Sequence, residues 1–261
     1  QKTAYEISLG LVGSEMCIRD STGADPSKGC IYLGLLNDYT GPFGPYGIPL
    51  ETGQRGFWLW ANQSGGIGDY SVAIVEGYDT QYNPQKHLEG YKAQRGEVAA
   101  LAMSLGTPQT QFILDDMDAD NMIAAPMSWY SGWSYKSSDR GLVVEFGAAY
   151  CADGMNAVDW ALANVPVDIK TIGIMGFAGD YGGDYAAGVK AAAAANGLNV
   201  AWEYVVPSPE FDVAQAVGLM VTQPVDAYFP AIGPTQMAQV AGGAFQQGLT
   251  PIAMMAAPSY N

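Results

Sequence analysis

Few side chains of this sequence are suited to catalysis or to metal binding. There is one histidine, His87, and there are three cysteines, Cys17, Cys30 and Cys151, none at the spacing of metal ligands. Cys151 has no nearby histidine in the sequence to activate its thiol, and the charged neighbours of His87 predict a surface histidine. Cys30 precedes a predicted strand and Cys151 follows another, so we expect them at opposite edges of a sheet without a disulfide between them. Zinc and Ser-His-Asp chemistry are not indicated.

Three aspartates, Asp116, Asp118 and Asp120, have the first three spacings of a calcium-binding loop. Asn121 stands where that loop needs a glycine and Met127 where it needs a glutamate, which favours a solvated acidic helix end instead. The glycine patterns of dinucleotide-binding and P-loop proteins are absent from the sequence. We therefore predict no metal ion and no organic cofactor.

The overall charge narrows the range of partners. Eleven basic residues stand against 26 acidic ones, so the formal net charge is -15. A field of this sign repels nucleic acids and anionic lipid headgroups. With 261 residues, 49% of them hydrophobic and 14% charged, the chain can bury a large core, and no apolar run approaches the roughly 18 residues of a membrane span.

Short apolar runs alternate with helical patterns from residue 30 onward, which is typical of βαβ units in a parallel sheet. The predicted strands are residues 31–36, 71–76, 98–103, 122–126, 142–146, 171–175, 200–206, 227–231 and 251–256. The predicted helices start near Pro49 and after Asn83, and then cover residues 109–118, 155–163, 184–195, 213–222 and 236–247. The predicted fold class is α/β with doubly wound, Rossmann-like parallel sheets.

The loops after the predicted strands contain many polar and aromatic residues. In an open α/β sheet, ligands bind beyond the carboxyl ends of the strands, where these loops lie. One of them contains Asp79. The aromatic residues expected to line a site there are Tyr39, Tyr46, Trp129, Tyr130, Trp133 and Tyr181. Such a lining suits an apolar or aromatic ligand side chain, because burial contributes about 25 cal/mol per Å².

The segment from Leu105 to Thr110 is a candidate for binding a negatively charged group. It leaves a strand and enters a helix, so the first amides of that helix have no intrahelical acceptor. Gly106 permits close approach, Thr107 and Thr110 add hydroxyl donors, and the helix dipole favours an anion. Because this loop has no lysine or arginine, we expect neutral donors to hold a carboxylate. An ordinary helix cap formed by Thr107 or Thr110 is the alternative.

The start of the chain differs from the rest. The string from Ser8 to Ser21, SLGLVGSEMCIRDS, resembles translated sequencing adapter, so we interpret residues 1–20 as a non-native leader. A genuine short amphipathic leader is the alternative. Residues 21–29 have the small polar composition of a linker.

Four segments carry a resemblance to a known family: YTGPFGPYG after the first strand, ANQSGGI, YDTQYNP and GDYGGDYAAGVKAAAAANG. With these segments, and over about residues 30–261, the chain resembles the type I periplasmic binding proteins. Within that class it resembles the extracellular ligand-binding receptors of the branched-chain amino acid ABC transporter group.

The resemblance implies two similar lobes, residues 30–146 and 147–261, which close about a hinge around a ligand held in the cleft between them, as periplasmic binding proteins do. It also implies that the second lobe is incomplete here, and that a signal peptide and lipid anchor belong to the full protein. An incomplete lobe is expected to expose a sheet edge and apolar faces, so the 261-residue chain should aggregate or unfold without cooperativity.

Site residues follow from the resemblance position by position. Gly106, Thr107 and Gln109 would hold a ligand carboxylate, with further contacts from the residues at the end of the fourth strand. Gly233 departs from the family pattern, because amino-acid binders often have an aromatic residue there near the ligand ammonium. The candidate ligand-binding residues are Tyr39, Tyr46, Asp79, Gly106, Thr107, Gln109, Thr110, Met127, Ser128, Trp129, Tyr181 and Gly233.

We therefore expect a solute-binding protein of an ABC transporter and not an enzyme. It would capture a small polar ligand, such as a branched-chain or related amino acid or amide, and deliver it to a membrane permease. We expect a monomer in the periplasm or otherwise outside the cytoplasm, either free or held there by a lipid anchor. A sensory domain of a signalling receptor or amide sensor is the alternative, and an enzyme would show turnover that depends on Asp79 or Asp180.

Overall fold

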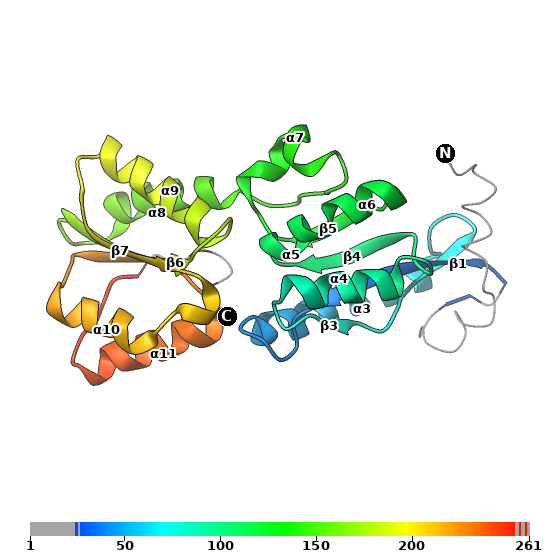
Figure 1. Cartoon of the computed structure of the whole chain (residues 1–261), viewed down its shortest axis with the longest axis horizontal. Coiled ribbons are helices and arrows are strands. Elements are labelled where there is room, and N and C mark those ends of the chain that lie inside the picture. Colours follow the sequence, from blue (N-terminus) through cyan, green and yellow to red (C-terminus); the bar gives the residue numbers. More distant parts are fainter. Residues whose placement is uncertain (1–23, 26, 254–255, 257–258, 260–261) are drawn as a thin grey trace. The chain divides into compact units, whose positions relative to one another are not determined.

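The computed structural model describes residues 24–25, 27–253, 256 and 259 (Figure 1). The predicted leader and part of the predicted linker lie outside these residues. The described chain divides into two compact units. Unit 1 comprises the described residues up to Ser128 together with Lys136–Glu145, and unit 2 comprises Trp129–Tyr135 and the described residues from Phe146 onward. Among the described residues, no helix combines the length and apolar character needed to cross a bilayer.

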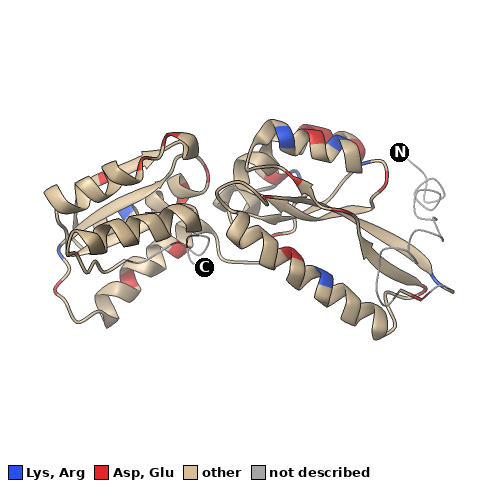
Figure 2. Ribbon diagram, turned by 90° about the horizontal axis from the view of Figure 1, so that it is seen from below, with Lys and Arg blue, Asp and Glu red and all other residues tan. Residues whose placement is uncertain are grey.

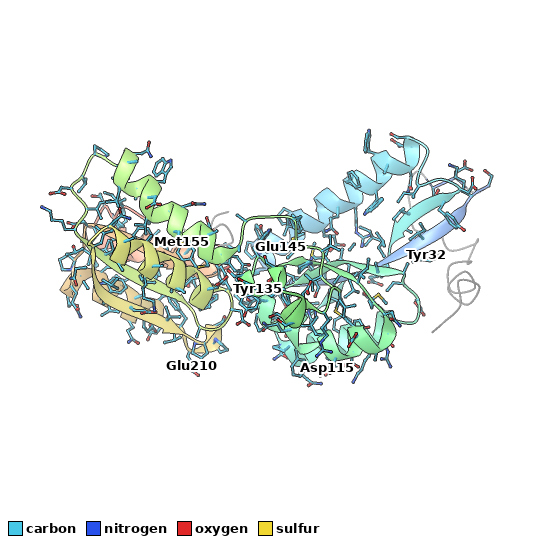
Figure 3. The ribbon with its side chains drawn as sticks, turned by 90° about the horizontal axis from the view of Figure 1, so that it is seen from above. Tyr32, Asp115, Tyr135, Glu145, Met155 and Glu210 are labelled. Carbon is cyan, nitrogen blue, oxygen red and sulfur yellow. The ribbon has the colours of Figure 1, made fainter. Side chains whose placement is uncertain are left out.

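Unit 1 is built on a five-stranded parallel sheet with strand order β2-β1-β4-β5, and β3 pairs with the end of β1. Its strands are β1 (Gly29–Asn37), β2 (Tyr70–Ile74), β3 (Tyr78–Asp79), β4 (Ala100–Leu105) and β5 (Ala124–Met127). Its helices are α3 (Gly44–Gln63), α4 (Pro84–Gln94), α5 (Thr107–Phe112), α6 (Leu114–Asp120) and α7 (Lys136–Asp139). Helices cover both sides of the sheet: Figure 3 shows α3 on one side and α6, which carries the labelled Asp115, on the other.

Unit 2 is built on a three-stranded parallel sheet with strand order β7-β6-β8. Its strands are β6 (Thr171–Phe177), β7 (Asn199–Val206) and β8 (Ala227–Ala231). Its helices are α8 (Tyr150–Asn164), α9 (Gly182–Ala195), α10 (Val213–Thr222) and α11 (Pro234–Gln246), with the short 3-10 helices η1 (Ser131–Ser134) and η2 (Ser208–Glu210). Helices α8 and α9 lie on one face of the sheet and α10 and α11 on the other (Figure 1). The predicted α/β fold with parallel sheets is confirmed.

Each unit has its own apolar core, which explains the continuous apolar runs of the strands. In unit 1, Leu36 and Leu101 from the sheet pack with Ile113 and Met117, and all four are buried. In unit 2 the corresponding fully buried residues are Ile172, Ile174, Tyr185, Val189 and Phe229. Strands covered on both faces need apolar side chains at successive positions and not only at alternate ones.

Helix α3 begins earlier than the sequence analysis predicts. It starts at Gly44, so Pro45 and not Pro49 occupies the first turn, where the missing N–H of a proline costs no intrahelical hydrogen bond. Pro49 lies inside the helix, where its missing N–H leaves the carbonyl four residues earlier without its usual donor. The predicted helix 109–118 is likewise two helices, because the backbone at Ile113 leaves helical geometry between α5 and α6.

Residues 142–146 are not a strand, which corrects another prediction. Val143 forms only a single parallel bridge with Ala124, whose backbone exchanges hydrogen bonds with Leu142 and Val144. The next donor along β5 would be residue 126, which is a proline and has no N–H. The pairing therefore stops after one residue.

The last predicted strand, residues 251–256, lies partly outside the described residues. Ala253 forms a parallel bridge with Tyr228, and the amide of Ala256 donates to the carbonyl of Pro230 at 3.0 Å. The described part therefore runs beside β8.

Candidate functional site

The carboxyl end of β1 carries two buried polar residues, Asn37 and Asp38. The Asp38 carboxylate accepts hydrogen bonds from the amides of Gly41 at 2.6 Å and Phe43 at 2.8 Å. Burial raises the pKa of Asp38 by more than these hydrogen bonds lower it. Asp38 thus shapes the loop into α3. Asp38 is not among the residues predicted from the sequence, although its place directly after a buried strand is a signal that could have identified it.

Asp79, at the end of β3, holds the neighbouring loops together. Its carboxylate accepts from the Tyr39 amide at 3.0 Å and from the Thr40 hydroxyl at 2.7 Å. It also accepts from the amide of Gln81 at 3.2 Å. Burial acts to raise the pKa of Asp79, but these hydrogen bonds outweigh it and the pKa is lowered. The carboxylate is ionised, and it joins the β1–α3 loop to the end of β3.

The two tyrosines of the β1–α3 segment are both half-buried. The Tyr39 hydroxyl donates to Glu51 at 2.5 Å, and Glu51 also accepts from the Arg55 guanidinium at 2.7 Å. Burial, and next the Glu51 carboxylate, raise the pKa of Tyr39. Burial also raises the pKa of Tyr46. The Tyr39 hydroxyl is therefore bound inside the protein, and whether the ring contacts a ligand stays a prediction.

The turn between β4 and α5 requires a glycine. Gly106 has φ 102°, a value that side-chain-bearing residues rarely adopt. A Cβ at this position would overlap Gln109 Oε1 and would lie 2.7 Å from the ring of Tyr82. Gln109 is buried, its Nε2 donates to the carbonyl of Tyr82 at 2.7 Å, and its Oε1 has no hydrogen-bond partner. The amide of Gly106 donates to the carbonyl of Met127 at 3.2 Å.

Two hydroxyls connect this turn to the end of β5. Thr107 and Ser128 are both buried, and their hydroxyl oxygens lie 2.5 Å apart, so either can donate. Met127 is partly exposed at the end of β5. The structure thus brings together Gly106, Thr107, Gln109, Met127 and Ser128, which the sequence analysis selected.

His87 is not on the surface, so that prediction is wrong. Its side chain is fully buried, and its Nε2 lies 2.8 Å from the hydroxyl of Ser104. Burial lowers the pKa of His87 to about 3. The reason is helical geometry: Tyr91, four residues later, is also fully buried, so both lie on the face of α4 that packs on the sheet. The helical repeat of α4, which places His87 and Tyr91 on the same face, could have predicted this burial. The charged residues beside His87 in the sequence suggested an exposed position instead.

The Thr110 hydroxyl is engaged inside the protein. It lies 2.8 Å from the hydroxyl of Ser104 and donates to the carbonyl of Gly106 at 2.9 Å. It does not form a helix cap, because α5 begins without a side-chain cap hydrogen bond. Whether Thr110 also contacts a ligand stays a prediction.

The aromatic residues between β5 and α8 pack on one another within unit 2. The Trp129 ring lies edge-on to Phe146 at 5.4 Å, and Tyr130 lies edge-on to Trp133 at 5.6 Å. Trp133 is buried, whereas Trp129 and Tyr130 are partly exposed. A Cβ on Gly147 would overlap the Trp129 indole, so that glycine provides the room for the ring.

Tyr181 and Gly233 lie at the carboxyl ends of strands of unit 2. Tyr181 is buried, and its hydroxyl donates to the carbonyl of Ile232 at 3.2 Å. The Tyr181 hydroxyl oxygen also lies 2.8 Å from the hydroxyl oxygen of Ser259. Gly233 is the N-cap of α11. Whether Tyr181 or Gly233 contacts a ligand stays a prediction.

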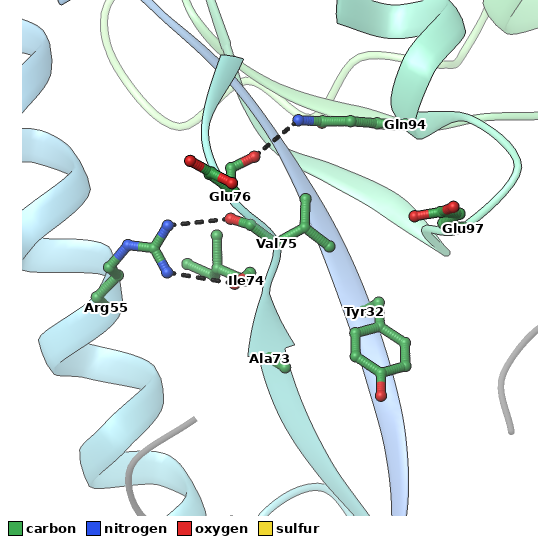
Figure 4. Close-up of a pocket in the computed structure, with 8 residues that line it drawn as sticks. All are labelled: Tyr32, Arg55, Ala73, Ile74, Val75, Glu76, Gln94 and Glu97. Carbon is green, nitrogen blue, oxygen red and sulfur yellow. Dashed lines mark hydrogen bonds between the residues drawn. The ribbon is translucent and has the colours of Figure 1, made fainter. Parts of the chain in front are cut away.

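A pocket of about 520 Å³ lies where β2 separates from β1 (Figure 4). Arg55 donates from α3 to the carbonyls of Ile74 and Val75, and Gln94 donates from α4 to the carbonyl of Glu76. These side chains supply the backbone hydrogen bonds that the strand loses on leaving the sheet. The residues lining the pocket are Tyr32, Arg55, Ala73, Ile74, Val75, Glu76, Gln94 and Glu97. None of them is a candidate ligand residue, so we assign this pocket a structural origin.

The acidic end of α6 is paired with arginines. Arg95 lies 3.1 Å from Asp120 and 3.8 Å from Asp116, and Arg140 lies 3.3 Å from Asp118. Acidic residues are spread over both units in Figure 2. Within the described part of the chain, no group of three or more histidine, cysteine, aspartate or glutamate side chains is placed to hold a metal ion.

The described cysteines differ in state. Cys30 is disulfide-bonded and Cys151 is free, so the two are not joined to each other. Burial, and next the charge of Asp184, raise the pKa of Cys151. Its sulfur is therefore held as a thiol, the form that is a poor nucleophile.

Comparisons with known proteins agree with one another. A family model described as periplasmic binding protein matches residues 30–261. The fatty acid ABC transporter substrate-binding protein from Thermomonospora curvata is 27% identical, with a TM-score of 0.80 over 93% of this chain and 61% of its own. A branched chain amino acid ABC transporter protein from Thermus thermophilus with bound valine is 15% identical, with a TM-score of 0.73 over 87% of this chain and 59% of its own.

A third solved structure, an R. palustris solute binding protein in complex with 4-hydroxybenzoate, is 16% identical, with a TM-score of 0.75 over 88% of this chain and 62% of its own. The chain thus spans about 60% of the length of these solved relatives. A search of the curated proteins finds no match.

Proposed function

Because this chain belongs to the periplasmic binding protein family, we propose that it is a solute-binding protein that captures a small carboxylate-bearing molecule for an ABC transporter. It delivers the ligand to a membrane permease and works outside the cytoplasm, as its substrate-binding relatives imply. The match to the family over residues 30–261 supports the role. The Gly106 turn supports the chemical class of the ligand.

The Gly106 turn offers neutral hydrogen-bond donors. Its loop, residues 105–110, contains no lysine or arginine. The amides of Thr107 and Gln109 lie in the first turn of α5, where no intrahelical carbonyl accepts from them. The absence of a side chain on Gly106 makes room for Gln109 and Tyr82, which pack against the turn. When Ser128 donates to Thr107, the Thr107 hydroxyl proton is left for an acceptor. Donors of this kind suit a carboxylate.

We also propose what the ligand carries besides its carboxylate. The half-buried rings of Tyr39 and Tyr46 provide apolar area for a side chain of the ligand. An amino acid with a branched or other apolar side chain has both a carboxylate and such a group. A fatty acid is the second candidate, because the solved relative at 27% identity is named for that ligand.

Pairs of acids and amides test the proposal. We would titrate the purified chain by calorimetry with leucine and leucinamide, octanoate and octanamide, and 4-hydroxybenzoate and its amide. We expect one acid to bind and to raise the melting temperature by mass action, and its amide to bind at least about tenfold more weakly. Equal affinity for acid and amide would remove the carboxylate from the proposal. If none of these compounds binds, the proposal that the chain binds a small carboxylate of these three kinds is contradicted.

The same samples test for enzymatic activity. Mass spectrometry of each ligand after long incubation should recover it unchanged. A product whose formation is lost in Asp79→Asn or Asp180→Asn would replace the binding proposal by an enzymatic one.

A further inference from the structure

Three buried polar side chains form a connected chain beneath the Gly106 turn. His87 from α4, Ser104 from β4 and Thr110 from α5 are all fully buried. His87 Nε2 lies 2.8 Å from Ser104 Oγ, which lies 2.8 Å from Thr110 Oγ1. Thr110 Oγ1 lies 2.9 Å from the carbonyl oxygen of Gly106. Three elements that are separate in the sequence are thereby connected to one peptide group.

The chemistry of the groups sets the direction of the hydrogen bonds. A carbonyl oxygen only accepts, so the Thr110 hydroxyl is a donor. Its nearer carbonyl acceptor is Gly106 at 2.9 Å, and the carbonyl of Ser104 lies at 3.2 Å. The oxygen of Thr110 then accepts from the hydroxyl of Ser104, whose oxygen in turn accepts from His87. His87 must therefore carry its proton on Nε2.

The other ring nitrogen agrees with this assignment. His87 Nδ1 is buried and has no hydrogen-bond partner, so a second proton placed there would have no acceptor. Burial lowers the pKa of His87 to about 3, which keeps the ring neutral near pH 7. The neutral Nε2–H form is the one that the chain of hydrogen bonds needs.

The peptide at the end of this chain is the one that matters for binding. The carbonyl of Gly106 and the amide of Thr107 belong to one planar group, so holding the oxygen sets the direction of the N–H. The amide of Thr110 also donates to this oxygen, at 3.0 Å. The buried Gln109 Oε1 lies against Gly106 without a hydrogen-bond partner, so an acceptor beside this peptide group is unsatisfied within the described residues.

We propose that His87, Ser104 and Thr110 are positioning residues that aim the Thr107 amide at the ligand carboxylate. This proposal rests on the proposed function, since it assigns these residues a role at the same turn. None of the three needs to touch the ligand. Their effect is to keep one peptide plane in a single orientation before the ligand arrives, which reduces the cost of ordering on binding.

Substitutions at Thr110 test the link to binding. Thr110→Val keeps the shape but removes the hydroxyl, and we expect it to weaken binding of the best acid of the panel about tenfold, as loss of a buried hydrogen bond does. Thr110→Ser restores the hydroxyl and should bind within about twofold of the original chain. Thr222→Val is the matched control, because Thr222 makes the same kind of bond to Gly218 in α10. It should leave affinity unchanged.

Because the chain has one histidine, His87 can be observed directly. In ¹⁵N-histidine-labelled protein we expect a protonated Nε2 and an unprotonated Nδ1, in one tautomer. Thr110→Val and Ser104→Ala should shift the Nε2 resonance, whereas Thr222→Val should not. Ser104→Ala also serves if Thr110→Val does not fold, because it breaks the same chain one residue earlier.

The outcomes separate this proposal from the proposed function. If an acid binds but Thr110→Val binds it as tightly as the original chain, the positioning role is wrong and the solute-binding role stands. If no acid binds, the solute-binding role fails for this panel and the positioning role fails with it. A proton on Nδ1 of His87 in the labelled protein would overturn the positioning role whatever the affinities are.

Discussion

Gly106 has a backbone angle, φ 102°, that makes a side chain costly, and its surroundings leave no room for one. We expect Gly106→Val to abolish measurable binding of the acid ligand, while unit 1 stays folded with a loss of about 1–3 kcal/mol. Calorimetry would measure the affinity and circular dichroism the fold.

Gly53→Ala is the control for this substitution. Gly53 lies within α3, and a Cβ added there would meet nothing within 4 Å. Alanine should therefore leave binding intact and stabilise the chain by up to about 1 kcal/mol. Binding by Gly106→Val at the original affinity would show that the ligand does not approach this turn.

His87 makes a prediction about pH. Its pKa is lowered to about 3 in the folded chain from 6.5, so below about pH 6 the unfolded chain takes up a proton that the folded chain does not. The stability that neutral His87 contributes is complete above pH 6.5 and falls as the pH drops toward 3, by about 1.4 kcal/mol per pH unit.

Urea unfolding between pH 7 and pH 4 would measure this dependence. His87→Gln keeps a donor but cannot titrate, so it subtracts the contribution of the acidic residues, which also titrate in this range. We expect the original chain to lose stability more steeply than His87→Gln. Parallel pH profiles would contradict the assignment of His87 as buried and neutral.

At the scale of elements, the clearest local determinant is the N-cap of α4. Asn83 Oδ1 accepts from the amides of Gln85 at 2.9 Å and Lys86 at 3.1 Å. We expect Asn83→Ala to lower the free energy of unfolding by about 1 kcal/mol, because two amides lose their acceptor. Asn83→Asp keeps the acceptor and should stay within about 0.5 kcal/mol of the original chain. Equal stability of the alanine and aspartate variants in urea unfolding would contradict the capping role.

At the scale of the whole molecule, the net charge of -15 opposes the approach of an anion. Acidic residues lie over both units in Figure 2. If the acid of the panel that binds is an anion, we expect its association rate constant to rise as salt is increased from about 10 mM to about 150 mM, because the repulsion is screened. Stopped-flow fluorescence would measure this rate constant, with the uncharged amide of the same acid as the control. A rate that falls with added salt would point to a local positive potential at the site.

Local physical chemistry was enough to predict much of this protein from its sequence. The bounds of α10 and β8 agree with the predicted residues 213–222 and 227–231, and Asn83 caps α4 as expected. These features depend on residue periodicity, capping side chains and apolar runs, all of which act within a few positions of the chain. The turn at Gly106 belongs to the same group, since a strand followed by glycine and a helix is a local pattern.

Only the tertiary structure decided what these elements present to one another. His87 and Ser104 are 17 positions apart, and the burial of His87 depends on which face of α4 packs on the sheet. The pairing of residues 142–146 ends because Pro126, on another segment, has no N–H to donate. Each outcome depends on a partner brought near by folding, and a local pattern in the sequence does not contain that partner.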